Sequence, residues 1–193
     1  MKKYQFLPAI LLAIFFVSCS AESDSPLEEV TQLSVMESRY AAIEVTETEE
    51  LSALPPISLA EAENILNTLH NHTNAKEELF IEKEGNAQLH VIIKQTISNK
   101  YAFTIQLNLS SYEDGTLFYN GYENSCSSHV MKWDMNGFSL ASSNTEKYTY
   151  NFTSNSYLYF KVADNGIRYM RVPVKIQGEY HTDNNNASYT YTL

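Results

Sequence analysis

One cysteine and one histidine of this chain stand close enough in sequence to form a nucleophile and its base. Cys126 and His129 are separated by two serines, and a thiol beside an imidazole is the pairing that a cysteine nucleophile or a metal site requires. Residues three apart on a strand point to opposite faces, so these two groups meet only in a loop or a bulge. We therefore expect Cys126 to be a small, partly buried thiol in an Asn- and Ser-rich connection.

The remaining histidines and carboxylates predict no catalytic or metal site. His70 and His72 are two positions apart at the end of a predicted helix, where they do not face each other. The segment Glu113-Asp114-Gly115 and the side chain of Asp164 are explained by turn chemistry. The chain has no His-Glu-x-x-His pair, no Cys-x-x-Cys pair and no Gly-rich phosphate loop. The sequence thus predicts no cofactor, no metal and no catalytic residue.

The tyrosines are the most suggestive residues for binding. The chain contains 14 of them, and Tyr157, Tyr159 and Tyr169 lie with Arg171 on one face of a predicted hairpin. Tyrosine offers apolar area with a polar tip at low entropic cost, which suits recognition of glycans or proteins. The same row can instead be covered by a second layer, or can stabilise a solvated sheet through cross-strand pairs. These four residues are the candidate ligand-binding site.

A capped helix is predicted just before the strands that carry these residues. Ser58 and Glu61 form a capping box, in which the serine side chain accepts from a free backbone N–H at the helix start. Apolar residues then recur at helical spacing: Leu59, Ala62, Ile65, Leu66 and Leu69. We expect the helix to end near His70-Asn71 and to bury this stripe.

The chain after about Lys76 is predicted to form strands and turns. Alternating apolar residues favour a hairpin with the loop Ser98-Asn99-Lys100, which places Ile93 opposite Ile105. A second hairpin is predicted at Asn136-Gly137, the preferred pair for a type I′ turn, with Met135 facing Phe138.

The third hairpin depends on its loop length. A two-residue loop at Asn165-Gly166 would place Phe160 opposite Arg171, mixing core with surface. A three-residue loop, Asp164-Asn165-Gly166, instead pairs Phe160 with Met170, and it puts the tyrosines on the other face. We therefore predict the three-residue loop, with Gly166 at positive φ.

Charge divides the chain into a spacer and a domain. The net charge of −10 argues against nucleic acid as a partner, because affinity for phosphates comes from clustered Lys and Arg. Residues 20–50 hold nine acidic residues and one basic residue, and the run closes at Pro55-Pro56. We expect residues 19–56 to be an acidic, flexible tether, in which residues 30–45 form at most a fraying helix without a convincing cap, and residues 57–193 to be one domain.

The first residues have the layout of a secretory signal. Lys2 and Lys3 form a positive start, and the apolar stretch 6–17 is too short for a permanent membrane helix. The stretch ends at Ser18-Cys19, which resembles the lipobox of bacterial lipoproteins, although Phe16 stands where that motif usually has Leu. The resemblance implies a signal peptide over residues 1–18 and a lipid on Cys19. It places the protein in the cell envelope, anchored to the outer membrane and facing either the cell surface or the periplasm.

Together these patterns predict an α+β fold that is mostly β, with one N-terminal capped helix and about eight antiparallel strands in a sandwich or a partly open barrel. The predicted function is a non-enzymatic binding or interaction module whose partner is a glycan or an envelope protein. Two alternatives remain: a secreted hydrolase using a carboxylate pair or Cys126 with His129, and a structural envelope protein or small enzyme inhibitor.

Overall fold

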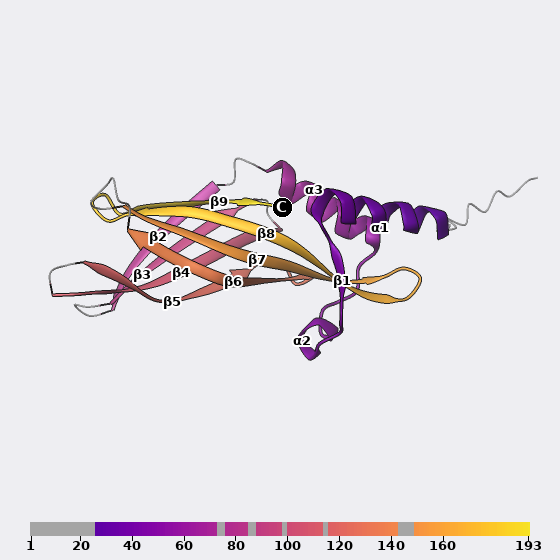
Figure 1. Cartoon of the computed structure of the whole chain (residues 1–193), viewed down its shortest axis with the longest axis horizontal. Coiled ribbons are helices and arrows are strands. Elements are labelled where there is room, and N and C mark those ends of the chain that lie inside the picture. The colour runs from indigo at the N-terminus through magenta and orange to yellow at the C-terminus, as the bar shows by residue number, and fades with distance from the viewer. Residues whose placement is uncertain (1–25, 73–75, 85–87, 98–99, 114–115, 143–148) are drawn as a thin grey trace, which may run out of the picture.

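Two antiparallel sheets packed face to face form the body of the molecule (Figure 1). The computed structural model describes residues 26–72, 76–84, 88–97, 100–113, 116–142 and 149–193. The predicted fold class is confirmed: within these residues the chain is mostly β, its eight longer strands are antiparallel, and the two sheets do not close into a barrel. The signal segment and Cys19 lie outside the described residues.

The four-stranded sheet is a meander of consecutive strands in the order β2-β3-β4-β5. Its strands are β2 (Lys76–Glu84), β3 (Gln88–Thr96), β4 (Ala102–Ser111) and β5 (Leu117–Cys126). The predicted register of the first hairpin is confirmed, with Ile93 opposite Ile105. One aliphatic row therefore faces inward.

The five-stranded sheet has the order β1-β8-β7-β6, with β9 paired to β8 as well. Its strands are β1 (Ile43–Val45), β6 (Met131–Ser142), β7 (Thr149–Ala163), β8 (Ile167–His181) and β9 (Asn186–Thr192). The three-residue loop is confirmed, because Ala163 pairs with Ile167, Phe160 pairs with Met170, and Gly166 has a φ of 138°.

The predicted hairpin at Asn136-Gly137 is wrong. Strand β6 runs through these residues without reversing and pairs with β7 along its whole length. The register shifts between Asn136 and Ser139, and Gly137 has a φ of 68°, so the pair forms a bulge. A type I′ turn needs positive φ at both central residues, whereas in this bulge Gly137 adopts it and Asn136 does not. Local sequence therefore specified the conformation of Gly137 but not its role.

Helix α3 (Leu59–Asn71) begins at the predicted cap and gains a second one from the sheet. The Ser58 side chain accepts from the backbone N–H of Glu61 at 3.1 Å. The backbone N–H of Leu59 donates to the Asp164 carboxylate at 2.7 Å, so the β7–β8 loop holds the helix start. A carboxylate there also suits the positive end of the helix dipole. Asp164 was predicted only as a turn residue.

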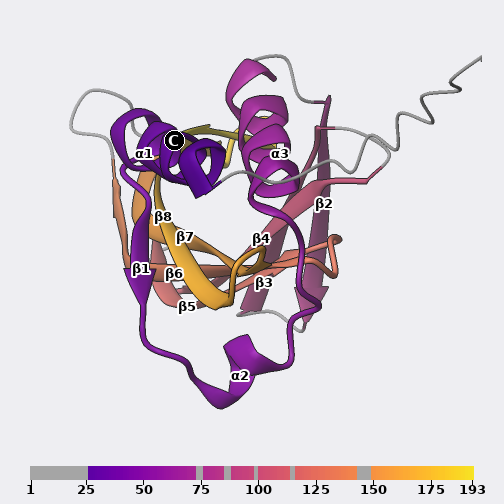
Figure 2. The same ribbon diagram turned by 90° about the vertical axis from the view of Figure 1, so that its right-hand side faces the viewer.

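The flexible tether is not found over its described part. Residues 26–56 form helix α1 (Pro26–Tyr40), strand β1 and helix α2 (Glu49–Ser52), and Met36, Tyr40 and Leu51 are buried. The Tyr40 hydroxyl donates to Asn67 Oδ1 at 2.8 Å, which ties α1 to α3. Figure 2 shows α1 and α3 side by side across the sandwich, between β1 of one sheet and β2 of the other. The acidic side chains described in this segment, from Glu37 to Glu50, are exposed on the outside of a packed layer.

The space between the sheets is filled by side chains. The Trp133 indole N–H donates to the buried Ser156 hydroxyl at 2.8 Å, and the Tyr189 hydroxyl donates across the sheets to the Phe103 carbonyl at 3.0 Å. A void of ≈ 10 Å³ beside Phe103, Trp133 and Tyr191 has room for about one water molecule. The space between the sheets at this point is too small for anything larger than a water molecule.

Candidate functional site

The predicted tyrosine row lies on the outer face of the five-stranded sheet, the side that points away from the other sheet. Strand pairing aligns Lys132, Tyr159 and Arg171 in one transverse row, and it places Asp134 opposite Tyr157 in the next. Each strand turns its other residues, such as Leu158 and Phe160, into the core. We call Lys132, Asp134, Tyr157, Tyr159 and Arg171 the tyrosine patch.

Two tyrosines of the patch are partly open to solvent and are oriented by cations. The rings of Tyr157 and Tyr159 are 6.3 Å apart and tilted by 58°. The Arg171 guanidinium lies 4.6 Å from the Tyr157 ring centre, and the Lys132 ammonium lies 6.0 Å from the Tyr159 ring centre. Cation–π contacts of this kind limit ring motion. The patch is therefore a partly ordered aromatic surface rather than a set of loose side chains.

Tyr169 is not available as a ligand-binding residue in this conformation. It is buried, and its hydroxyl donates to Glu47 Oε1 at 2.8 Å. Burial, and then the neighbouring Glu47 carboxylate, raise the pKa of the Tyr169 phenol. The segment that joins β1 to α2 covers this end of the row, so only Tyr157 and Tyr159 of the three predicted tyrosines remain accessible.

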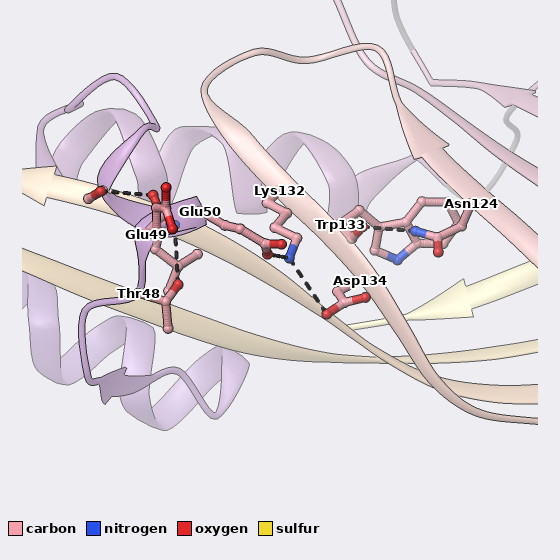
Figure 3. Close-up of polar contacts among 9 residues, drawn as sticks. Thr48, Glu49, Glu50, Asn124, Lys132, Trp133 and Asp134 are labelled. Carbon is pink, nitrogen blue, oxygen red and sulfur yellow. Dashed lines mark hydrogen bonds and ion pairs between the residues drawn. The ribbon is translucent and has the colours of Figure 1, made fainter.

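Helix α2 binds the two lysines at the edge of the patch. Lys132 forms an ion pair with Glu50 and lies 3.8 Å from Asp134 (Figure 3). The hydrogen bond from Lys132 lowers the pKa of the Glu50 carboxyl. The Lys161 ammonium donates to the Ser52 carbonyl at 2.7 Å. Glu50 and Asp134 therefore offset the charge of Lys132, whereas the bond from Lys161 to a carbonyl leaves the charge of that ammonium in place.

A polar groove extends the patch along β7, β8 and β9, and sequence reasoning missed it. One open hollow of ≈ 270 Å³ is lined by Asn151, Gln177, Glu179, Ser188 and Thr190. The next hollow, of ≈ 190 Å³, is lined by Gly137, Thr153, Asn155, Lys175 and Gln177. Gln177 borders both hollows, so we call the two together the amide groove. The available signal was the alternation Asn-x-Thr-x-Asn on β7 facing Lys-x-Gln-x-Glu on β8.

Cys126 and His129 do not form the geometry of a catalytic pair. Cys126 ends β5 as a partly buried thiol that accepts from the backbone N–H of Ser128 at 3.5 Å, whereas His129 is exposed. Burial raises the pKa of the Cys126 thiol. A nucleophilic cysteine needs a lowered pKa, so this environment fits the structural role expected for Cys126.

The raised pKa predicts slow reaction of Cys126 with alkylating reagents. The thiolate is the reactive form, and a raised pKa leaves less of it at pH 8. We expect iodoacetamide to modify Cys126 in the folded chain at least about tenfold more slowly than in urea, with a rate that is still rising above pH 9. Peptide mass spectrometry of the Cys126 adduct measures this rate. Equal rates in folded and unfolded protein would contradict the prediction.

The two helix histidines are not brought together as metal ligands. The ring of His72 makes a 2.7 Å hydrogen bond to the Thr68 carbonyl, and the exposed ring of His70 lies edge-on to Tyr40 with 6.0 Å between centres. In the described part of the chain, no three His, Cys, Asp or Glu side chains are grouped to hold a metal ion. Over the same residues, no helix combines the length and apolarity needed to cross a bilayer.

Comparison with known proteins gives one match. A family model described as "Domain of unknown function (DUF5033)" matches residues 24–193. No curated protein and no solved structure matches the chain. The match covers all the described strands and helices, including the part that sequence analysis assigned to a tether.

Proposed function

This chain belongs to the DUF5033 family, and for this member we propose a non-enzymatic binding module, held at the cell envelope by a lipid on Cys19, that takes its ligand on the outer face of the five-stranded sheet. The observation that carries the binding role is the tyrosine patch. Tyr157 and Tyr159 are partly exposed aromatic rings, oriented by cations and continuous with an open polar groove. Aromatic residues in such settings dominate binding energy at interfaces.

The surroundings of Cys126 weigh against the hydrolase alternative in which this thiol is the nucleophile. Its thiol is partly buried with a raised pKa, and the nearby His129 side chain is exposed to solvent. The sheet pairing, by contrast, places several side chains suited to recognition on one surface. The side chains on the outer face of the five-stranded sheet are therefore better suited to binding a ligand than to catalysing a reaction.

The anchoring proposal rests on the lipobox resemblance of residues 16–19. Lipid chains on Cys19 would hold the protein at a membrane surface. Six residues lie between Cys19 and Pro26, where α1 begins, and the seven backbone steps from Cys19 to Pro26 reach at most about 25 Å when fully extended. The domain would then sit close to the bilayer, rather than at the end of the long spacer that the acidic composition suggested.

The binding proposal predicts that ligand affinity depends on the tyrosine patch. The full chain is tested against three probe classes: neutral polysaccharides (dextran, mannan and xylan), acidic polysaccharides (polygalacturonate and heparin) and an immobilised random peptide library. We expect the double variant Tyr157→Ala/Tyr159→Ala to weaken binding to the recognised class at least about tenfold, because interface aromatics contribute most of the binding energy.

Tyr112→Ala is the matched control for this experiment. Tyr112 is a tyrosine with 58% of its surface exposed, and it lies beyond the end of β4 in the other sheet. The control should bind as the wild type does. Failure of all probes, or equal binding by the double variant and the wild type, would overturn the proposed function.

A further inference from the structure

We infer that the ligand is a neutral polysaccharide chain that lies along β7 and β8, with its sugars in the amide groove and against the tyrosine patch. This inference rests on the proposed binding function and names its ligand class. It draws on three properties of the outer face: unpaired amides, balanced charge and length.

The amides of the groove are free to bind a ligand. In the described part of the chain, the side-chain amides of Asn151, Asn155 and Gln177 make no hydrogen bond to protein. Each amide presents two N–H donors and a carbonyl acceptor side by side. A sugar hydroxyl both donates and accepts, so adjacent donors and acceptors match pairs of neighbouring hydroxyls. Ser188 and Thr190 add hydroxyls to the same wall.

Positive and negative charges on this face are equal in number. Lys132 contacts Glu50 and Asp134, and Glu179 lies 3.3 Å from the His181 ring. The charged residues on or contacting the face are four basic and four acidic ones: Lys132, Lys161, Arg171, Lys175, Glu47, Glu50, Asp134 and Glu179. An acidic polymer requires a surplus of cations, and a basic peptide requires a surplus of anions. A neutral ligand requires neither.

The dimensions of the site favour a chain over a single small molecule. From Asn151 to Tyr159 the site follows nine residues of β7, whose eight backbone steps span about 26 Å. The two hollows, of ≈ 270 and ≈ 190 Å³, are open, and each is smaller than a typical enclosed pocket for a drug-sized ligand. Each hollow suits one ring of an extended polymer. Tyr157 and Tyr159 then offer aromatic area to the apolar faces of the next sugars.

A protein partner fits this surface less well. The core of a protein interface is enriched in aromatic and apolar residues and depleted in Ser, Lys and Glu. The amide groove is lined mainly by Asn, Gln, Ser and Thr with Lys175 and Glu179, and its one aromatic lining residue, Tyr189, is buried. A peptide ligand is therefore an outcome that the experiment must be able to report.

The experiment is affinity electrophoresis of the folded full chain through gels that contain one polysaccharide at a time. The groove variants are Asn155→Ala and Gln177→Ala, and the control is Asn120→Ala, an exposed amide on β5 of the other sheet. We expect at least one of dextran, mannan and xylan to retard the wild type, and each groove variant to weaken that binding about fivefold, as loss of a hydrogen bond between neutral groups does. Asn120→Ala should behave as the wild type, and all three variants should unfold at the wild-type temperature.

The outcomes separate the inference from the function on which it rests. Binding of only the acidic polysaccharides or the peptides, lost in Tyr157→Ala/Tyr159→Ala, would overturn the neutral polysaccharide and leave the proposed function standing. Retention by a neutral polysaccharide that is unchanged in the groove variants would overturn the groove as its site. No retention by any probe would overturn both.

Discussion

Replacing Gly178 with alanine is expected to lower the free energy of unfolding by about 3 kcal/mol or more, toward the upper end of overpacking effects. A Cβ at this position would lie 2.1 Å from Cζ of Phe152 and 2.5 Å from the Ser188 carbonyl oxygen. Phe152 is fully buried between the sheets, and the Ser188 carbonyl belongs to β9 backbone paired with β8. Neither atom can move without disturbing the core or the strand pairing, so the clash strongly destabilises the folded state.

Urea unfolding followed by circular dichroism measures the effect of Gly178→Ala, and Gly137→Ala is its matched control. A Cβ on Gly137 would meet no atom within 4 Å, although its φ of 68° makes a side chain unfavourable. The control should therefore lose only about 1–2 kcal/mol, the cost of the left-handed backbone. Equal losses in the two variants would show that Phe152 and Ser188 can yield, against this prediction.

Replacing Cys19 with alanine is expected to move nearly all of the protein from the membrane fraction to the soluble fraction. In the proposed lipoprotein, Cys19 carries the lipid chains, and membrane affinity grows with each buried methylene group. Removing the attachment point removes the anchor. Fractionation of cells followed by immunoblotting measures the distribution, and mass spectrometry of the N-terminal peptide identifies the modified residue.

The matched control for the anchor is Cys126→Ser, which changes the second of the chain's two cysteines. This variant should stay in the membrane fraction, because Cys126 lies within the folded domain at the end of β5. Membrane association that persists in Cys19→Ala would refute the lipid anchor. The binding proposal would remain, because its probes are applied to the isolated protein.

Features set by neighbouring residues were predictable from the sequence. The Ser58–Glu61 cap depends on groups within one turn of helix. The three-residue loop after Ala163 depends on whether core residues or surface residues face each other across the hairpin. Alternation in β3, β4, β7 and β8 then assigned the inner and outer faces, including the shared face of Tyr157 and Tyr159.

The sequence by itself therefore determined the strand class, the helix start, two hairpin registers and the face on which the tyrosines lie, since each depends on contacts between residues that are near in sequence or paired in one hairpin.

Only the tertiary structure decided the rest. The Asn136-Gly137 pair satisfies both a turn and a bulge, and continuous pairing with β7 selected the bulge. The acidic composition of residues 26–56 suggested a spacer. Three apolar side chains of this segment, Met36, Tyr40 and Leu51, are nevertheless buried, because elements distant in sequence pack on them. The same packing covered Tyr169, and the pairing of β9 with β8 completed the amide groove. The outer face therefore combines a β7–β8 pairing that the local pattern predicts with contributions from β9 and from the β1–α2 segment that the local pattern did not reveal.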